Sequence, residues 1–160
     1  MIQCPFSAIG LIHSPFKNIE GMPIQPAAAR GTPGSIELFE EYRPGLKDLE
    51  GFSHVVLIYH LHLCRGYELE VVPFLDTVPR GVFATRAPRR PNPIGLSIVR
   101  LTGVADGMLR IEDVDIVDGT PLLDIKPYVP DLDAPASVRI GWLDGKTQEL
   151  ANRKSDDRFK

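Results

Sequence analysis

The chain has 160 residues, a net charge of −3 at pH 7 and 43% hydrophobic residues, which describes one ordinary globular domain. No apolar stretch approaches the ~18 residues that span a bilayer, and no basic and apolar leader opens the chain, so we expect a cytoplasmic protein without a membrane partner. The net negative charge excludes a strongly basic protein that wraps nucleic acid, but it does not exclude a local basic patch. Cys4 and Cys64 lie far apart, which argues against a disulfide framework and a cysteine zinc site.

The 15 prolines and 14 glycines divide the chain into short segments. Residues 20–34 are so rich in both that they exclude a helix or a central strand. Residues 43–51 predict one short turn of helix at most, because a glycine ends the helical spacing. Apolar and alternating segments predict strands, in chain order, at residues 6–12, 35–39, 52–63, 81–85 and 96–102.

Two Asp-Gly pairs mark turns in the second half of the chain. Asp106-Gly107 predicts a hairpin, and Asp118-Gly119 predicts a second turn. Short strands between such turns predict an all-β fold, most simply a small closed β-barrel with short helical turns, because closure removes the strand edges. We expect a single barrel domain over residues 1–143 and a charged C-terminal tail, either a terminal helix or a loose end, over residues 144–160.

A loop with arginines between prolines is the first candidate functional feature. Arg86, Arg89 and Arg90 lie among prolines that hold the backbone extended. A planar guanidinium suits carboxylates, phosphates and base edges, so the loop predicts a binding function, with a solvated basic loop as the alternative.

Three histidines and an acidic cluster have simpler interpretations. His54, His60 and His62 share one face of a predicted strand, but they lack an evident carboxylate or cysteine partner, so we expect hydrogen-bonded histidines and no metal site. The aspartates near residues 115–124 are typical of a turn and a cross-strand ion pair. No Gly-x-Gly-x-x-Gly loop, P-loop or Gly-x-Ser-x-Gly elbow is present.

Six ordered segments carry a resemblance to a known family. They are residues 9–16 (IGLIHSPF), 23–26 (PIQP), 51–54 (GFSH), 81–86 (GVFATR), 90–97 (RPNPIGLS) and 118–128 (DGTPLLDIKPY). In this order they resemble the TsaA-like (YaeB-like, TrmO) family over about residues 6–142.

The resemblance implies a β-barrel methyltransferase that uses S-adenosylmethionine as methyl donor. It also implies a homodimer with its site at the subunit interface, and methylation of N6 of threonylcarbamoyladenosine next to the anticodon of a tRNA. The implied cofactor contacts are Gln25, Pro26, Ala27, Leu61, His62, Arg86, Leu96, Glu112, Asp113, Val114 and Asp115.

Chemistry assigns roles to the remaining loop residues. Arg86 suits the carboxylate or the ribose of the cofactor, and Arg89 and Arg90 suit RNA phosphates. The Asn92 oxygen and the Pro93 carbonyl form a pair that can hold the amine of adenine in line with the methyl group, so Asn92 is the candidate catalytic residue, with a role in shaping the turn as its alternative. The alternative function is an S-adenosylmethionine-binding module that acts on a small molecule or senses the cofactor, without tRNA.

Overall fold

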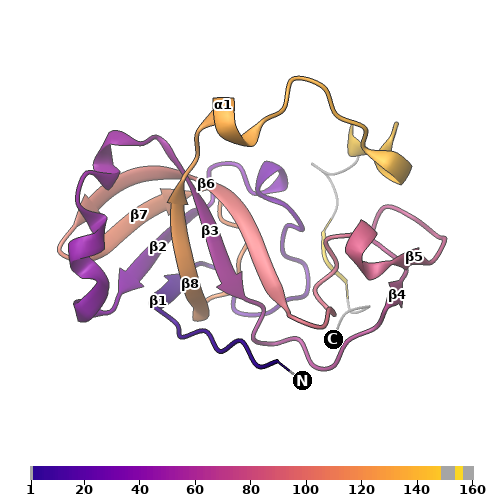
Figure 1. The fold of residues 1–160 in the computed structure, drawn as a ribbon, viewed down its shortest axis with the longest axis horizontal. Helices are drawn as coiled ribbons and strands as arrows, with labels where there is room; N and C mark the ends of the chain where they lie inside the picture. The colour runs from indigo at the N-terminus through magenta and orange to yellow at the C-terminus, as the bar shows by residue number, and fades with distance from the viewer. Residues whose placement is uncertain (1, 149–153, 157–160) are drawn as a thin grey trace.

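A closed antiparallel barrel forms the body of the protein in the computed structural model, which describes residues 2–148 and 154–156 (Figure 1). The prediction of an all-β closed barrel is confirmed, and the strands follow the order β1-β2-β7-β6-β3-β8 around it. The strands are β1 (Gly10–His13), β2 (Pro33–Leu38), β3 (His54–His60), β6 (Ile94–Ala105), β7 (Met108–Glu112) and β8 (Thr120–Pro127).

Alternate side chains of every strand fill the barrel interior. Ile12, Ile36, Leu57, Leu109 and Leu122 are fully buried there. Burial of each such side chain stabilises the fold by ~1.5–3 kcal/mol relative to exposure. The barrel is therefore a packed frame, and a ligand must bind outside its interior.

The hairpin between β6 and β7 forms at the predicted turn. Asp106 and Gly107 adopt φ values of 53° and 78°, the left-handed pair that a two-residue hairpin turn requires. The second predicted turn also forms, with Gly119 at φ 75°. The strand that follows it, β8, pairs with β1 and β3, so this turn does not close a hairpin.

Two local predictions are wrong. Residues 81–85 do not form a strand, because the two-residue β5 (Arg80–Gly81) gives way to the 3-10 helix η4 (Val82–Ala84), which the Thr85 hydroxyl closes by donating to the Val82 carbonyl at 2.8 Å. Pro33 opens β2, which lies between β1 and β7, although the proline was expected to exclude a central strand. A proline is tolerated at the first position of a strand.

Short helices and a small second sheet surround the barrel. Helices η2 (Glu40–Leu46) and η3 (Leu49–Gly51) occupy the region where a single turn was predicted, and Leu46 joins the barrel core. Strand β4 (Glu70–Val71) pairs with β5. The remaining elements are η1 (Pro26–Ala28), α1 (Pro130–Asp133) and η5 (Gly141–Leu143). Within the described residues, no helix has the length and apolar character needed to cross a membrane.

The described part of the C-terminal region folds back beside the barrel (Figure 1). Ser155 exchanges backbone hydrogen bonds with Gly21 and Met22 at 3.0 and 2.9 Å, and Lys154 forms a bridge with Pro23. This contact brings the C-terminal residues to the same end of the barrel as β4, β5 and η4. The division into a domain over residues 1–143 and a tail over 144–160 stays a prediction, and residues 149–153 and 157–160 of that tail lie outside the described residues.

Candidate functional site

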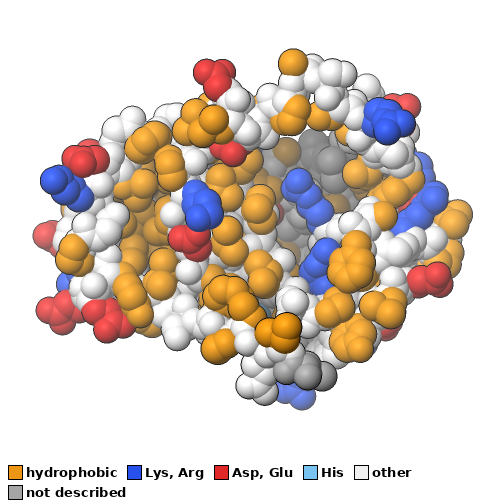
Figure 2. All heavy atoms as spheres, viewed as in Figure 1, with side chains coloured by type: hydrophobic (Ala, Val, Ile, Leu, Met, Phe, Trp, Pro, Cys, Tyr) orange, Lys and Arg blue, Asp and Glu red, His pale blue; other side chains and the backbone are white. Residues whose placement is uncertain are grey.

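A pocket of about 810 Å³ lies between the barrel and the segments beside it. Figure 2 shows the hollow, with Lys and Arg side chains at its edge. The barrel contributes the ends of β3 and β6 and the loop after β7, and the opposite wall comes from η4, η5 and the described C-terminal residues. The pocket is therefore assembled from segments that lie far apart in the sequence.

Asp115 is the carboxylate on the barrel side of the pocket. It follows Asp113, whose left-handed backbone (φ 68°) ends β7 and whose side chain accepts a hydrogen bond from the Gly31 amide at 2.7 Å. Val114 and Ile116, on either side of Asp115, are buried in the core. This alternation turns the Asp115 side chain toward the pocket that it lines.

A buried hydrogen-bond chain supports Asp115 from behind. The Ser97 hydroxyl donates to Asp115 Oδ1 at 2.7 Å, and the Tyr59 hydroxyl lies 2.9 Å from Ser97 Oγ. Burial raises the pKa of Asp115 to about 6, against the opposing effects of the Ser97 hydrogen bond and the Arg86 charge. Burial also raises the pKa of Tyr59, so this phenol stays protonated.

Gly95 makes room for this chain of hydrogen bonds. A Cβ atom at Gly95 would overlap the ring of Tyr59, its cross-strand partner. The absence of a side chain at Gly95 therefore lets the ring lie flat against β6 and bring its hydroxyl to Ser97.

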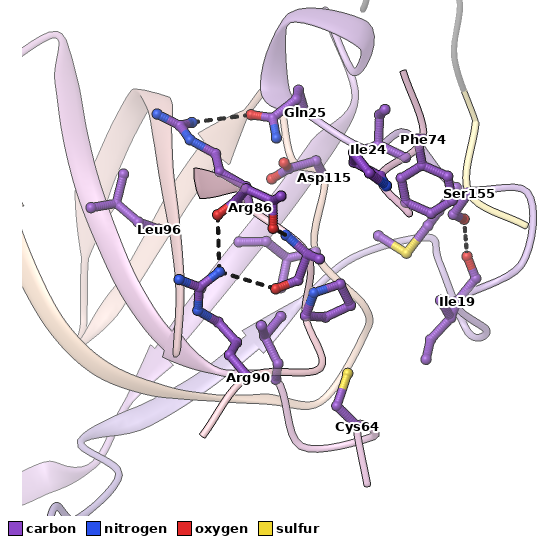
Figure 3. A pocket seen from close by; sticks show the side chains of 18 of the residues that line it. Ile19, Ile24, Gln25, Cys64, Phe74, Arg86, Arg90, Leu96, Asp115 and Ser155 are labelled. Carbon is purple, nitrogen blue, oxygen red and sulfur yellow. Dashed lines mark hydrogen bonds between the residues drawn. The ribbon is translucent and has the colours of Figure 1, made fainter. Parts of the chain in front are cut away.

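Arg86 lies beside Asp115 and makes a polar contact with Gln25 across the pocket wall. Its Nη1 donates to Gln25 Oε1 at 3.2 Å, and the guanidinium is exposed (Figure 3). Figure 3 shows Asp115, Arg86 and Gln25 gathered at one side of the pocket, with Phe74 and Ser155 at another. The site thus offers one carboxylate and one exposed cation a short distance apart within a largely apolar cavity.

The other two arginines of the loop have intramolecular partners. Arg90 Nη1 donates to the carbonyls of Thr85 and Ala87 at 3.0 and 3.2 Å, which holds the loop in place (Figure 3). Arg89 pairs with Glu68 at 2.9 Å. The predicted phosphate contacts of Arg89 and Arg90 stay predictions, and both side chains have a structural role in the loop.

The structure brings about half of the expected cofactor residues to the pocket. Those that line it are Gln25, Leu61, His62, Arg86, Leu96 and Asp115. The others lie outside its lining: Pro26 and Ala27 form η1, Glu112 pairs with Arg100, Asp113 binds the Gly31 amide, and Val114 is fully buried.

Asn92 is exposed and does not line the pocket. The Pro93 carbonyl, which we expected to help hold the substrate amine, already accepts the Leu61 amide at 2.7 Å. The backbone carbonyl of Asn92 accepts the Ile94 amide at 2.8 Å, as in a tight turn. The catalytic role of the Asn92 side chain stays a prediction, whereas the structure gives its backbone a turn-forming role.

Sequence reasoning missed Trp142, which lines the pocket, and the charged residues that surround its ring. Trp142 donates from its indole Nε1 to the Ala84 carbonyl at 2.7 Å, and the guanidinium of Arg80 and the ammonium of Lys146 each lie 5.6 Å from its ring centre. Asp76 pairs with both cations, at 2.7 and 3.0 Å. The single Trp of the chain was the one available signal, because nothing in the local sequence connects residue 142 to η4.

The histidines do not converge. His62 lines the pocket, where burial lowers its pKa, while His60 is exposed and His54 contacts the Ser53 hydroxyl at 2.9 Å. Over residues 2–148 and 154–156, no three His, Cys, Asp or Glu side chains form a group that would hold a metal ion.

These features define a class: a small antiparallel β-barrel protein with a largely apolar ligand pocket that places a buried aspartate beside an exposed arginine and is bordered by the C-terminal segment. The chain belongs to the tRNA-methyltransferase O N-terminal domain family, whose model matches residues 11–134. This confirms the resemblance that its motifs carry.

Relatives and solved structures agree with the assignment. A probable S-adenosyl-L-methionine-binding protein of Pyrococcus abyssi is 53% identical over 96% of this chain and 84% of its own length. The tRNA (adenine(37)-N6)-methyltransferase of Escherichia coli is 38% identical over 81% of this chain and 60% of its own length. The crystal structure of TrmO from Pseudomonas aeruginosa matches with a TM-score of 0.74 and 40% identity, over 88% of this chain and 63% of that one. This chain therefore spans less than two thirds of those two longer proteins.

Proposed function

We propose that this protein is an S-adenosylmethionine-dependent methyltransferase that modifies N6 of an adenosine in tRNA. The family assignment supports the reaction class, and the pocket supports a site for it. The observation that carries the proposal is the placement of Asp115 and Arg86 at one wall of a largely apolar pocket. Threonylcarbamoyladenosine next to the anticodon is the specific acceptor that we propose.

The residues present fit this cofactor. S-adenosylmethionine supplies a methyl group on a cationic sulfur, and it also carries a carboxylate and an adenine. Arg86 is an exposed cation for the carboxylate, and Asp115 is an anion on the same wall. Leu61 and Leu96 offer apolar surface to the adenine. Because methyl transfer is an in-line displacement, the main contribution of such a site is alignment of the two reactants.

A tRNA partner is consistent with the charges around the pocket. Lys and Arg side chains lie at the edge of the hollow although the whole chain is acidic (Figure 2). Arg86 is exposed there, and phosphate contacts by such side chains position a nucleic acid without reading its sequence. We place this function in the cytoplasm, where tRNA is abundant.

We also propose a homodimer in which a second copy covers the outer face of β6 beside the pocket. Ile94, Leu96 and Ile98 project from that face with 40%, 51% and 37% of their surface exposed. Leu96 lines the pocket as well. A second copy seated on this apolar strip would therefore border the site and shield it from water.

One observation favours a second candidate function. The Pyrococcus abyssi relative is named for S-adenosyl-L-methionine binding alone. A module that binds the cofactor and methylates a small molecule, or only senses the cofactor, would use the same pocket and the same Arg86. The two functions differ in whether RNA enters the site.

Mass spectrometry of nucleosides tests the proposal. Total tRNA is incubated with the protein and with S-adenosylmethionine that carries an isotopically labelled methyl group. We expect the label on N6 of threonylcarbamoyladenosine, and binding to tRNA that weakens steeply as salt rises. Label on another adenosine would keep the reaction and replace the acceptor. Cofactor binding without any label on RNA would support the second candidate instead.

A further inference from the structure

Three side chains from different parts of the barrel meet behind the pocket and form a single hydrogen-bonded unit. Tyr59 comes from β3, Ser97 from β6 and Asp115 from the loop after β7. Ser97 is 1% exposed and Tyr59 is 6% exposed, and of the three residues Tyr59 and Asp115 line the pocket. A buried polar chain of this kind costs desolvation free energy, and its carboxylate end faces the ligand pocket.

The orientation of the hydroxyl groups determines what Asp115 can do. The Ser97 hydroxyl donates to Asp115 Oδ1, and the protonated phenol of Tyr59 is within hydrogen-bond distance of Ser97 Oγ. Both hydroxyl protons can therefore point toward the carboxylate. This arrangement holds the side chain in one rotamer and favours its ionised form, which accepts protons from the pocket side.

We infer that Asp115 is the proton acceptor of methyl transfer and that Ser97 is its positioning residue, an inference that rests on the proposed function. As the N–CH3 bond forms at the acceptor amine, the S–CH3 bond breaks and its electron pair stays on sulfur. N6 keeps its own proton while it gains the methyl group and so becomes cationic, and that proton passes to the Asp115 carboxylate. Solvent later removes it.

The other ionisable groups around the pocket fit this role less well. Arg86 and Arg90 are permanent cations, and the Tyr59 hydroxyl is already protonated. His62, which follows β3, is a neutral base that lines the pocket and is the rival acceptor. Asp156 reaches the pocket from the C-terminal segment, on the wall opposite the barrel. Asp115 alone combines a carboxylate, a fixed rotamer and a position beside Arg86.

Burial tunes Asp115 for proton transfer near neutral pH. With its pKa raised to about 6, the side chain is mostly ionised at pH 7.5 and yet binds a proton more tightly than an ordinary aspartate. The folded protein pays for this in stability, because a carboxyl group whose pKa rises on folding destabilises the fold as the pH increases through that pKa.

The test compares Asp115→Asn and Ser97→Ala with wild type, using S-adenosylmethionine and the tRNA that wild type methylates. We expect Asp115→Asn to lower kcat by about 100-fold or more while the cofactor Kd changes less than threefold. Wild-type activity should decrease as the pH is lowered through about 6, where Asp115 becomes protonated. In Ser97→Ala this decrease should occur at higher pH, because the lost hydrogen bond favoured the ionised form of Asp115. A merely structural role for Ser97 would leave the position of the fall unchanged.

A readout without cofactor uses the pH dependence of unfolding. Wild type should lose stability as the pH increases from about 4 to about 8, because the pKa of Asp115 is higher in the folded than in the unfolded protein. Asp115→Asn cannot ionise, so its stability relative to wild type should increase over the same range. The matched control is Asp106→Asn, the same chemical change in the left-handed turn of the β6–β7 hairpin, which an asparagine also tolerates. The control should leave kcat, Kd and the pH dependence of stability unchanged.

Several outcomes would overturn the inference, and they are distinct from failure of the proposed function. Equal kcat for Asp115→Asn and wild type would remove the role of Asp115 alone. A tenfold weaker cofactor Kd with retained kcat would make Asp115 a cofactor ligand only. If activity no longer decreased at acid pH in His62→Gln but still decreased in Asp115→Asn, the proton acceptor would be His62 and not Asp115. If wild type methylates no tRNA at all, the proposed function fails and this inference fails with it.

Discussion

The three arginines of one loop have different surroundings, and we therefore expect them to differ in function. Arg86 is exposed and contacts Gln25, whereas Arg89 is held by Glu68 and Arg90 by backbone carbonyls. A guanidinium that already has strong partners gains little from a ligand, because those partners must first be released. At the residue scale, Arg86, the exposed arginine with the weakest partner of the three, is therefore the one to test against the cofactor.

Arg86→Ala should weaken S-adenosylmethionine binding by about tenfold or more, the effect of removing one charge-assisted hydrogen bond. Arg89→Ala, its matched control, should change the cofactor Kd less than threefold, because Arg89 pairs with Glu68 and does not line the pocket. Isothermal titration calorimetry in the presence of a chelator measures both values. Equal losses in the two variants would contradict this division, and binding that disappears with the chelator would point to a metal.

Asp76 connects two elements at the scale of the pocket wall. Its carboxylate, 6% exposed, accepts hydrogen bonds from Arg80 at the start of β5 and pairs with Lys146 after η5. These two cations hold the pKa of Asp76 far below its usual range. Trp142 lies against the same cations and reaches η4 through its indole hydrogen bond. The wall of the pocket thus depends on a charge cluster as well as on apolar packing.

Asp76→Asn should lower the Tm at pH 7 and weaken cofactor binding, because the C-terminal segment loses its ionic attachment to β5. A carboxyl group whose folded pKa is depressed stabilises the protein above its ordinary pKa, and this contribution is lost as the pH falls below that value. The Tm difference from wild type should therefore shrink below the ordinary pKa of 3.8. Differential scanning fluorimetry from pH 7 down to 3 measures it, with Asp106→Asn as control. A Tm difference that stays constant across this range would show that the ion pairs do not stabilise the wall.

At the scale of the whole molecule, the proposed homodimer depends on the exposed apolar strip on β6 formed by Ile94, Leu96 and Ile98. Ile98→Glu places a charge on that strip without altering a pocket-lining residue, so we expect light scattering to show a monomer and calorimetry to show weaker cofactor binding. Met108→Glu is the matched control, because Met108 is 36% exposed, close to the 37% of Ile98, and lies at the start of β7 by the hairpin turn. A wild-type protein that is monomeric and fully active would refute the dimer.

The alternation of apolar residues and the position of turns made much of the barrel predictable. The strands around residues 54–60 and 94–105 and the Asp106-Gly107 hairpin follow from local patterns, because alternation and a left-handed turn pair are properties of neighbouring residues. The segment after Gly81 was misread because its apolar residues satisfy a 3-10 turn as well as a strand. The choice between strand and 3-10 helix depended on the packing of Val82 against Val71 and Ala87. Val71 is distant in the sequence, and Ala87 lies beyond the turn that η4 makes.

The sequence by itself determined the fold class through its composition and turns, and the family through its ordered motifs; the resemblance to that family then implied six of the residues that line the pocket. Only the tertiary structure decided which aspartate is perturbed and which arginine of the loop is exposed at the pocket. Asp115 and Asp76 are the same residue type, and their pKa values shift in opposite directions because one is buried against hydroxyl groups and the other is surrounded by cations. Burial and charge contacts arise when distant segments pack together, so no local pattern records them.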